Sequence, residues 1–328
     1  MRLSVNTYIS IAVLLLGLIQ LSCDAPRDNP LDPDNTSNKI YSIEGTLLSG
    51  EVTPNPVSGA SVSWPPENLY TVTDQSGYFN INCTTRVNGW LYFEKTGFTK
   101  DSVYVNWNGQ KKAAVQPRLN YLPVIDVLDI YSSIKNKYSV AEYQLFFDVT
   151  LHDPDDDITG VKIENSDLQI SKSLTKITST YFEGRFSDIE LNITAFDEVV
   201  GKRFDLKVFT ASGDSFQLQG KSIVRIVKDE VIVISPINSD TLTTTTPLLN
   251  WTRLTPGFNF SYTIEVYTDE TEPVLQWKKE NISSEEVFMT VETPLTVTVN
   301  NNKFFWVIWC IDNYKNKSRS KPAGFVIK

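Results

Sequence analysis

An acidic loop at residues 153–157 is the stretch of the sequence whose residue types most directly suggest chemistry. It holds Asp153, Asp155, Asp156 and Asp157. Carboxylate oxygens crowded on one loop are the hard ligands that Ca²⁺ takes in proteins. We therefore take Asp153, Asp155 and Asp157 as candidate calcium ligands. The alternative is a solvated acidic turn whose side chains bond the local backbone, and the glycine and glutamate of an EF-hand loop are missing here.

Groups for catalysis are scarce in the sequence. The chain has a single histidine, His152, which removes most His-based catalytic and zinc sites. A lone histidine without partners makes neither a triad nor a zinc site, so we expect a strand-end residue there. The sequence also has no glycine-rich phosphate loop, no nucleophile elbow and no His-Glu-X-X-His motif. We predict that the protein is not an enzyme and needs no cofactor beyond the candidate Ca²⁺. A carbohydrate-active enzyme is the weaker alternative.

Cys23 stands at the end of an N-terminal segment with its own composition. Arg2 supplies a positive start, residues 9–19 form an apolar run, and small Ser22 precedes the cysteine. This order is typical of an export signal. The apolar run is too short to span a bilayer stably. We therefore predict a signal peptide over residues 1–22.

The Leu21-Ser22-Cys23 junction resembles the lipobox of bacterial lipoproteins, with Gln20 where that family usually has an apolar residue. The resemblance implies that the sulfur of Cys23 is acylated, with palmitate or a similar chain, and that the membrane is a partner. Two or three acyl chains hold a protein on a membrane durably, because each buried methylene contributes about 0.8 kcal/mol. We expect the protein to lie in a bacterial cell envelope, at the outer membrane, on either its periplasmic or its surface side.

Two alternatives to the lipid anchor follow from the same segment. Cleavage by an ordinary signal peptidase would leave a soluble secreted protein with a free cysteine near its end. A eukaryotic secreted protein would suit the seven Asn-X-Ser/Thr sequons, although such matches arise by chance in a chain rich in these residues.

Composition limits the partners and the redox chemistry. The chain has 328 residues, enough for two or three domains, and its net charge of -9 argues against nucleic acid as a partner. Apart from Cys23, only Cys83 and Cys310 are present. Both lie in apolar strand patterns of different predicted domains, so we expect two free buried thiols. Residues 23–39 are rich in Pro and Asp and predict a disordered tether after the acylated cysteine.

Residues 40–119 alternate apolar and polar side chains between turns, as the strands of a half-buried sheet do. The Asp74-Gln75-Ser76-Gly77 stretch between two such runs predicts a tight hairpin turn. The order resembles the carboxypeptidase regulatory-like domain on Gly45, residues 56–62, Thr73-Asp74, Gly77-Tyr78-Phe79 and Lys95-Thr96-Gly97-Phe98. The resemblance implies a small transthyretin-like sandwich that serves as a structural or binding module.

Residues 120–229 predict a second sandwich. Strands are expected at 144–151, 158–163, 204–209 and 222–227, with a hairpin turn at 211–215. The Asp-Pro-Asp-X-Asp loop after the first of these resembles bacterial immunoglobulin-like repeats, with Asp156 where a glycine is usual. That resemblance implies an immunoglobulin-like β-sandwich.

Residues 230–328 predict a third sandwich, which resembles a fibronectin type III domain of bacterial lipoprotein type. The matching points are Pro247-X-Leu249-X-Trp251, Tyr262-X-Ile264-X-Val266 and Phe304-X-Trp306-X-Ile308-X-Cys310, closing on Asp312 and Asn316. The resemblance makes Trp251 the core tryptophan. The whole chain is therefore predicted to be all-β, a tandem of immunoglobulin-like and fibronectin type III-like sandwiches.

The last long strand predicts a surface as well as a core. A period of two puts Phe304, Trp306, Ile308 and Cys310 inside and Val307 and Trp309 outside. An apolar outward face suits docking, or stacking on a sugar, so Tyr267, Val307 and Trp309 are candidate docking or glycan residues. The alternative is that a neighbouring domain or loop covers them.

Tandem sandwiches usually serve as spacers or binding surfaces, so we expect a membrane-anchored module for adhesion, glycan binding or envelope assembly. An accessory subunit of an outer-membrane transport or secretion complex is the alternative.

Overall fold

Alternating apolar and polar residues form strands along almost the whole of the computed structural model, which describes residues 40–298 and 301–328. The predicted signal peptide, Cys23 and the tether at 23–39 lie outside the described residues. The helical pieces of the described chain are short: η2 (Pro65–Glu67), α2 (Asp188–Leu191) and η3 (Phe196–Val199). The all-β prediction is confirmed. In the described part of the chain, no helix combines the length and apolar character that a bilayer crossing needs.

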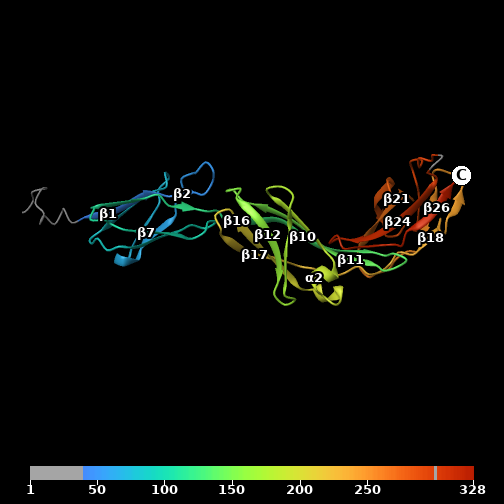
Figure 1. Ribbon diagram of the computed structural model, residues 1–328, viewed down its shortest axis with the longest axis horizontal. Helices are drawn as coiled ribbons and strands as arrows, with labels where there is room; N and C mark the ends of the chain where they lie inside the picture. Colours follow the sequence, from blue (N-terminus) through green and yellow to red (C-terminus); the bar gives the residue numbers. More distant parts are fainter. Residues whose placement is uncertain (1–39, 299–300) are drawn as a thin grey trace, which may run out of the picture. The chain divides into compact units, whose positions relative to one another are not determined.

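The chain divides into two units between Tyr121 and Leu122, coloured blue to teal and green to red in Figure 1. The first unit holds two sheets and a short pair. One sheet has the order β5-β1-β8, with β1 (Tyr41–Thr46), β5 (Tyr78–Cys83) and β8 (Lys112–Val115). The other has the order β4-β3-β6-β7, with β3 (Ser61–Trp64), β4 (Leu69–Val72), β6 (Gly89–Glu94) and β7 (Asp101–Val105). The pair joins β2 (Leu48–Ser49) to β9 (Arg118–Leu119).

The core of the first unit lies between the two sheets. Trp64 is fully buried, and Phe79 and Phe93 meet edge to face at 5.5 Å between ring centroids. Thr73 is buried at the crossing between the sheets, where its hydroxyl donates to the carbonyl of Val57 at 2.6 Å and accepts from the amide of Ala60 at 2.9 Å.

The hairpin predicted around Asp74 is wrong, because β4 and β5 belong to different sheets. The turn itself forms. Asp74 Oδ1 accepts from the amides of Ser76 and Tyr78 at 2.8 and 2.9 Å, and Gly77 has a φ of 74°. A tight turn with these residue types therefore serves equally well to carry the chain from one layer to the other.

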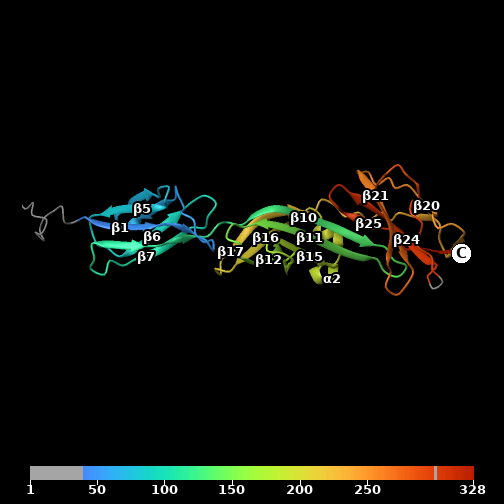
Figure 2. The ribbon, with the colours of Figure 1, turned by 90° about the horizontal axis from the view of Figure 1, so that it is seen from above.

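The second unit is built on one long sheet with the order β14-β15-β11-β10-β25-β24-β21-β22, extended by β26 and β19. Figure 2 shows β10 (green) running beside β25 (red). Its strands are β10 (Val124–Lys135), β11 (Glu142–His152), β14 (Thr175–Lys176), β15 (Tyr181–Phe186), β19 (Asp240–Leu242), β21 (Phe260–Thr268), β22 (Leu275–Ser283), β24 (Lys303–Asp312), β25 (Lys317–Arg319) and β26 (Ala323–Ile327).

Two smaller sheets cover this long sheet. The order β13-β12-β16-β17 joins β12 (Ile158–Asn165), β13 (Ile170–Ser173), β16 (Arg203–Thr210) and β17 (Ser215–Ser222). The order β18-β20-β23 joins β18 (Val233–Ser235), β20 (Leu248–Trp251) and β23 (Phe288–Thr290). The hairpin at 211–215 is confirmed between β16 and β17, whereas the strand expected at 222–227 is wrong, because β17 ends at Ser222.

Each smaller sheet encloses its own core, which gives a middle sandwich and a C-terminal sandwich within the second unit. In the middle one, Phe147 and Phe204 pack edge to face at 5.2 Å. In the C-terminal one, Trp251 is buried and packs on Tyr262 at 5.5 Å, as expected for the core tryptophan. Phe304, Trp306, Ile308 and Cys310 are all fully buried in this core, as period two predicts.

A buried polar junction joins the two sandwiches of the second unit. Asn316 is fully buried, and its Oδ1 accepts from the amide and the hydroxyl of Ser132 at 2.8 and 3.1 Å. Its Nδ2 donates to Asp312 Oδ2 at 3.1 Å, and Arg225 Nε lies 3.5 Å from the same oxygen. The Asn316 side chain thus bonds β10 through its carbonyl oxygen, while Asp312 of its own sandwich holds its amide nitrogen.

Candidate functional site

The acidic loop lies between β11 and β12, directly after His152 at the exposed end of its strand. Asp155 is buried, whereas Asp153 and Asp157 are half-buried. The amide of Asp157 donates to Asp153 Oδ2 at 3.3 Å, and Asp156 has a φ of 51°, the left-handed backbone that favours glycine. The loop therefore organises its own backbone, as an acidic turn does.

Electrostatics in this loop penalise ionisation of one carboxyl. The pKa of Asp153 is raised to about 6, chiefly by burial. A hydrogen bond with the Asp157 side chain and the charges of Asp157 and Asp155 contribute to this rise, and the backbone hydrogen bond from Asp157 opposes it. Within 40–298 and 301–328, no group of three or more Asp, Glu, His or Cys side chains is placed to hold a metal ion. Calcium at Asp153, Asp155 and Asp157 stays a prediction.

The structure brings Tyr267, Val307 and Trp309 together on β21 and β24, but not as an open surface. Val307 is fully buried, Trp309 is 8% exposed and Tyr267 is half-buried. Glu265 Oε2 accepts from Trp309 Nε1 and from the Tyr267 hydroxyl, both at 2.9 Å. These side chains already have partners within the chain, which is the arrangement that the covered-face alternative describes.

Two basic residues of β25 cover Trp309. Lys317 Nζ lies 5.2 Å from the Trp309 ring centroid, and it also stands over the rings of Tyr131 and Phe146 at 5.7 and 5.6 Å. Arg319 lies over Trp309 at 5.8 Å. Burial lowers the pKa of Lys317. The result is a cation–π cluster that links β24 of the C-terminal sandwich to β10 and β11 of the middle one.

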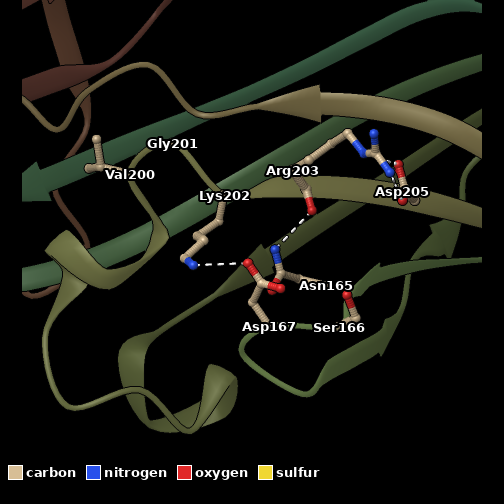
Figure 3. A pocket seen from close by; sticks show the side chains of 8 residues that line it. All are labelled: Asn165, Ser166, Asp167, Val200, Gly201, Lys202, Arg203 and Asp205. Atoms are coloured by element: carbon tan, nitrogen blue, oxygen red, sulfur yellow. Dashed lines mark hydrogen bonds and ion pairs between the residues drawn. The ribbon is translucent and has the colours of Figure 1, made fainter.

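A polar pocket of about 460 Å³ opens in the middle sandwich (Figure 3). Its charged groups pair with one another: Lys202 Nζ lies 2.9 Å from Asp167 Oδ2, and Arg203 Nε lies 2.9 Å from Asp205 Oδ1. Asn165 Nδ2 donates to the carbonyl of Arg203 at 2.8 Å. The pocket thus presents neutralised pairs, and no nucleophile–base couple is among the residues that line it.

The solvent-facing side of the sheet β4-β3-β6-β7 carries exposed rings that sequence reasoning missed. Their exposed fractions are 81% for Tyr70, 49% for Trp90, 46% for Tyr92 and 51% for Tyr104. The strand registers place Ser61, Ser63, Val72, Glu94 and Ser102 among them. We call this surface the aromatic face. The alternation of Trp90-Leu91-Tyr92-Phe93, with Leu91 and Phe93 buried, is the signal that could have found it.

Registers fix the arrangement of the aromatic face. Trp90 stands opposite Tyr104, and their rings meet edge to face at 5.3 Å between centroids. Tyr92 and Tyr70 flank Ser63 from the two neighbouring strands. The spacing of strands puts Tyr92 and Tyr70 about 10 Å apart across the sheet, and Tyr92 about 7 Å from Trp90 along β6.

The outer side of the opposite sheet, β5-β1-β8, is polar instead. Asn80 and Asn82 are exposed there, and Lys112 Nζ lies 3.4 Å from Glu44 Oε1. Its one exposed ring among the described residues, Tyr78, donates a hydrogen bond to Glu44 Oε2 at 3.4 Å. The gathering of rings is thus a property of one face of the first unit.

Comparisons with known proteins give likenesses in solved structures alone, since no family model and no curated protein matches the chain. The FN1-FN3 domains of chicken CNTN1 are 8% identical with a TM-score of 0.30, covering 83% of this chain and 92% of that one. Fibronectin(III)-like modules of Clostridium thermocellum CbhA are 12% identical with a TM-score of 0.29, covering 63% and 93%. The Bacillus anthracis TIE protein is 10% identical with a TM-score of 0.22, covering 88% and 48%. These TM-scores are low, so the sandwich architecture rests on the strand order of this chain itself.

Proposed function

We propose that the protein is a lipid-anchored, non-catalytic binding protein of a bacterial cell envelope, held at the outer membrane through Cys23. Its first unit is proposed to be a carboxypeptidase regulatory-like sandwich, and its second unit an immunoglobulin-like and a fibronectin type III-like sandwich fused through one sheet. The observation that carries the binding part is the aromatic face. Exposed rings gathered on one surface favour an interaction role, since isolated apolar residues are the norm on a solvated sheet.

The anchoring part is supported by the sequence around Cys23, where an export signal ends in a small residue followed by cysteine. Binding modules held at a membrane work at high local concentration, which compensates for modest affinity at each module.

Metabolic labelling with an alkyne fatty acid, followed by membrane fractionation, tests the anchor. We expect the intact protein to carry the label and to fractionate with membranes, and Cys23→Ala to lose both. Cys83→Ala is the matched control, because Cys83 is buried and burial raises the pKa of its thiol to about 11. A wild-type protein that is unlabelled and soluble would overturn the lipoprotein proposal.

A further inference from the structure

We propose that the aromatic face of the first unit binds a neutral polysaccharide, an inference that rests on the proposed binding function and names its ligand class. The aromatic face combines aromatic rings with hydroxyl groups, and a pyranose ring can interact with both. Aromatic ring faces carry negative partial charge and attract electropositive C–H groups, and a pyranose presents such groups on its flat side. Hydroxyls between the rings offer hydrogen bonds to those of the sugar.

The hydroxyls on the face are free to bind a ligand. Tyr70, Tyr92 and Tyr104 have no side-chain hydrogen bond to any residue that the structure describes, and the same holds for Ser63, which stands between two of the rings. Tyr78 on the opposite face differs, because Glu44 occupies its hydroxyl. A ligand that supplies hydroxyls therefore meets hydroxyl groups on the aromatic face that no neighbouring side chain occupies.

The charges on the aromatic face favour a neutral polysaccharide over an acidic one. Glu94 is the charged side chain among those that the registers place on this face, and Lys100 Nζ lies 2.7 Å from its Oε1. The registers place no basic cluster on the face that would hold an acidic polysaccharide. A neutral glycan has no such penalty.

The composition also favours a glycan over a protein partner. Protein interfaces surround their aromatic anchors with a dry apolar core, whereas Val72 is the aliphatic side chain that the registers place on this face. Serine hydroxyls occupy the space between the rings. Such a surface stays wet between its stacking points, as binding to a hydroxyl-rich polymer requires.

The spacing of the rings suits a ligand of several linked sugars. Trp90 and Tyr104 form one stacking point, fixed by their edge-to-face contact. Tyr92 and Tyr70 extend the platform about 10 Å across the strands, which is longer than one pyranose ring. The antiparallel sheet holds the backbone of these residues at fixed registers, so binding has only their side chains to order.

Affinity gel electrophoresis of the full-length protein in mild detergent tests the inference. The gels contain hydroxyethylcellulose, xyloglucan, arabinoxylan or galactomannan as neutral polymers, and polygalacturonate or alginate as acidic ones. We expect retardation by at least one neutral polymer and by neither acidic one. Trp90→Ala and Tyr92→Ala are expected to weaken retardation by about tenfold each, because each removes a stacking surface.

Tyr78→Ala is the matched control, an exposed tyrosine on the opposite sheet that should leave binding unchanged. Unchanged melting temperatures of the variants show that the fold is intact, which is expected because the substituted rings are exposed. Retardation by none of the neutral polymers, by the acidic ones alone, or equally for wild type and Trp90→Ala, overturns the inference. An alkyne-labelled protein without glycan binding would still support the anchored module, whereas an unlabelled protein that binds glycan would overturn the anchor alone.

Discussion

At the scale of single residues, Asp153 has the clearest measurable consequence. Its pKa rises from 3.8 to about 6 in the folded chain, chiefly by burial. The folded state therefore binds the proton more tightly than the unfolded state, and stability falls as pH rises through the interval between these two values. Above it, the ionised carboxylate destabilises the fold.

We expect Asp153→Asn to raise the free energy of unfolding of the second unit by about 1 kcal/mol near neutral pH, a figure discounted because the group is partly exposed. The amide oxygen retains an acceptor for the Asp157 N–H. Thermal melts at a series of pH values check this. The difference between the two proteins should vanish below about pH 4, and a constant difference across the series would contradict the assignment.

The same variant decides between calcium and an acidic turn. If Ca²⁺ binds the loop, CaCl₂ raises the melting temperature of the wild type above its value in EDTA, and Asp153→Asn loses that increase. An equal melting temperature in both buffers establishes the acidic turn. Either result fixes the role of Asp153, Asp155 and Asp157.

At the scale of elements, β1 of the first unit has no room for a side chain at Gly45. A Cβ built there would stand 2.1 Å from the carbonyl oxygen of Val115 on β8. We expect Gly45→Ala to lower the stability of the first unit by about 2 kcal/mol, because backbone must shift to admit a methyl group. Gly160→Ala is the control, since nothing lies within 4 Å of its Cβ position. Calorimetry on both variants tests this, and equal effects would refute it.

The junction at Asn316 is the corresponding element of the second unit. Asn316→Ala leaves the buried amide of Ser132 and the Asp312 carboxylate without this partner. We expect a loss of about 2–3 kcal/mol in the stability of the second unit. Asn313→Ala, at an exposed position of the same turn, should change it little. A small loss at Asn316 would mean that the junction does not couple the sandwiches.

Sequence patterns predicted the strands that have one apolar face and one more polar face. The strands β11, β16, β21 and β24 follow from alternation along the chain, and so does the burial of Trp306. The pairing of β10 with β25 could not be predicted, because Ser133 and Lys317 are far apart in sequence and no local pattern records their register. The covering of Trp309 by Lys317 and Arg319 comes instead from the pairing of β25 with its chain neighbour β24. The aromatic face could have been predicted from the alternation of exposed and buried residues around Trp90 alone.

At the scale of the whole molecule, the two units each enclose their own cores. We expect two calorimetric transitions, because the first unit has a core of its own and the two sandwiches of the second unit share one continuous sheet and the Asn316 junction. Gly45→Ala should lower one transition and Asn316→Ala the other. A single transition that both variants lower together would show that the units unfold as one.

The parallel pairing of β10 with β25 has a consequence for biogenesis. A chain that emerges from its N-terminus exposes β10 long before residues 317–319 appear, and during that interval residues 133–135 and the amide of Ser132 lack their partners. Unpaired strand edges recruit other chains, so the growing polypeptide is most prone to aggregation during this interval. Premature termination before Lys317 would prolong that state indefinitely. Synthesis of residues 317–319 is therefore the step that allows β10 to complete its pairing.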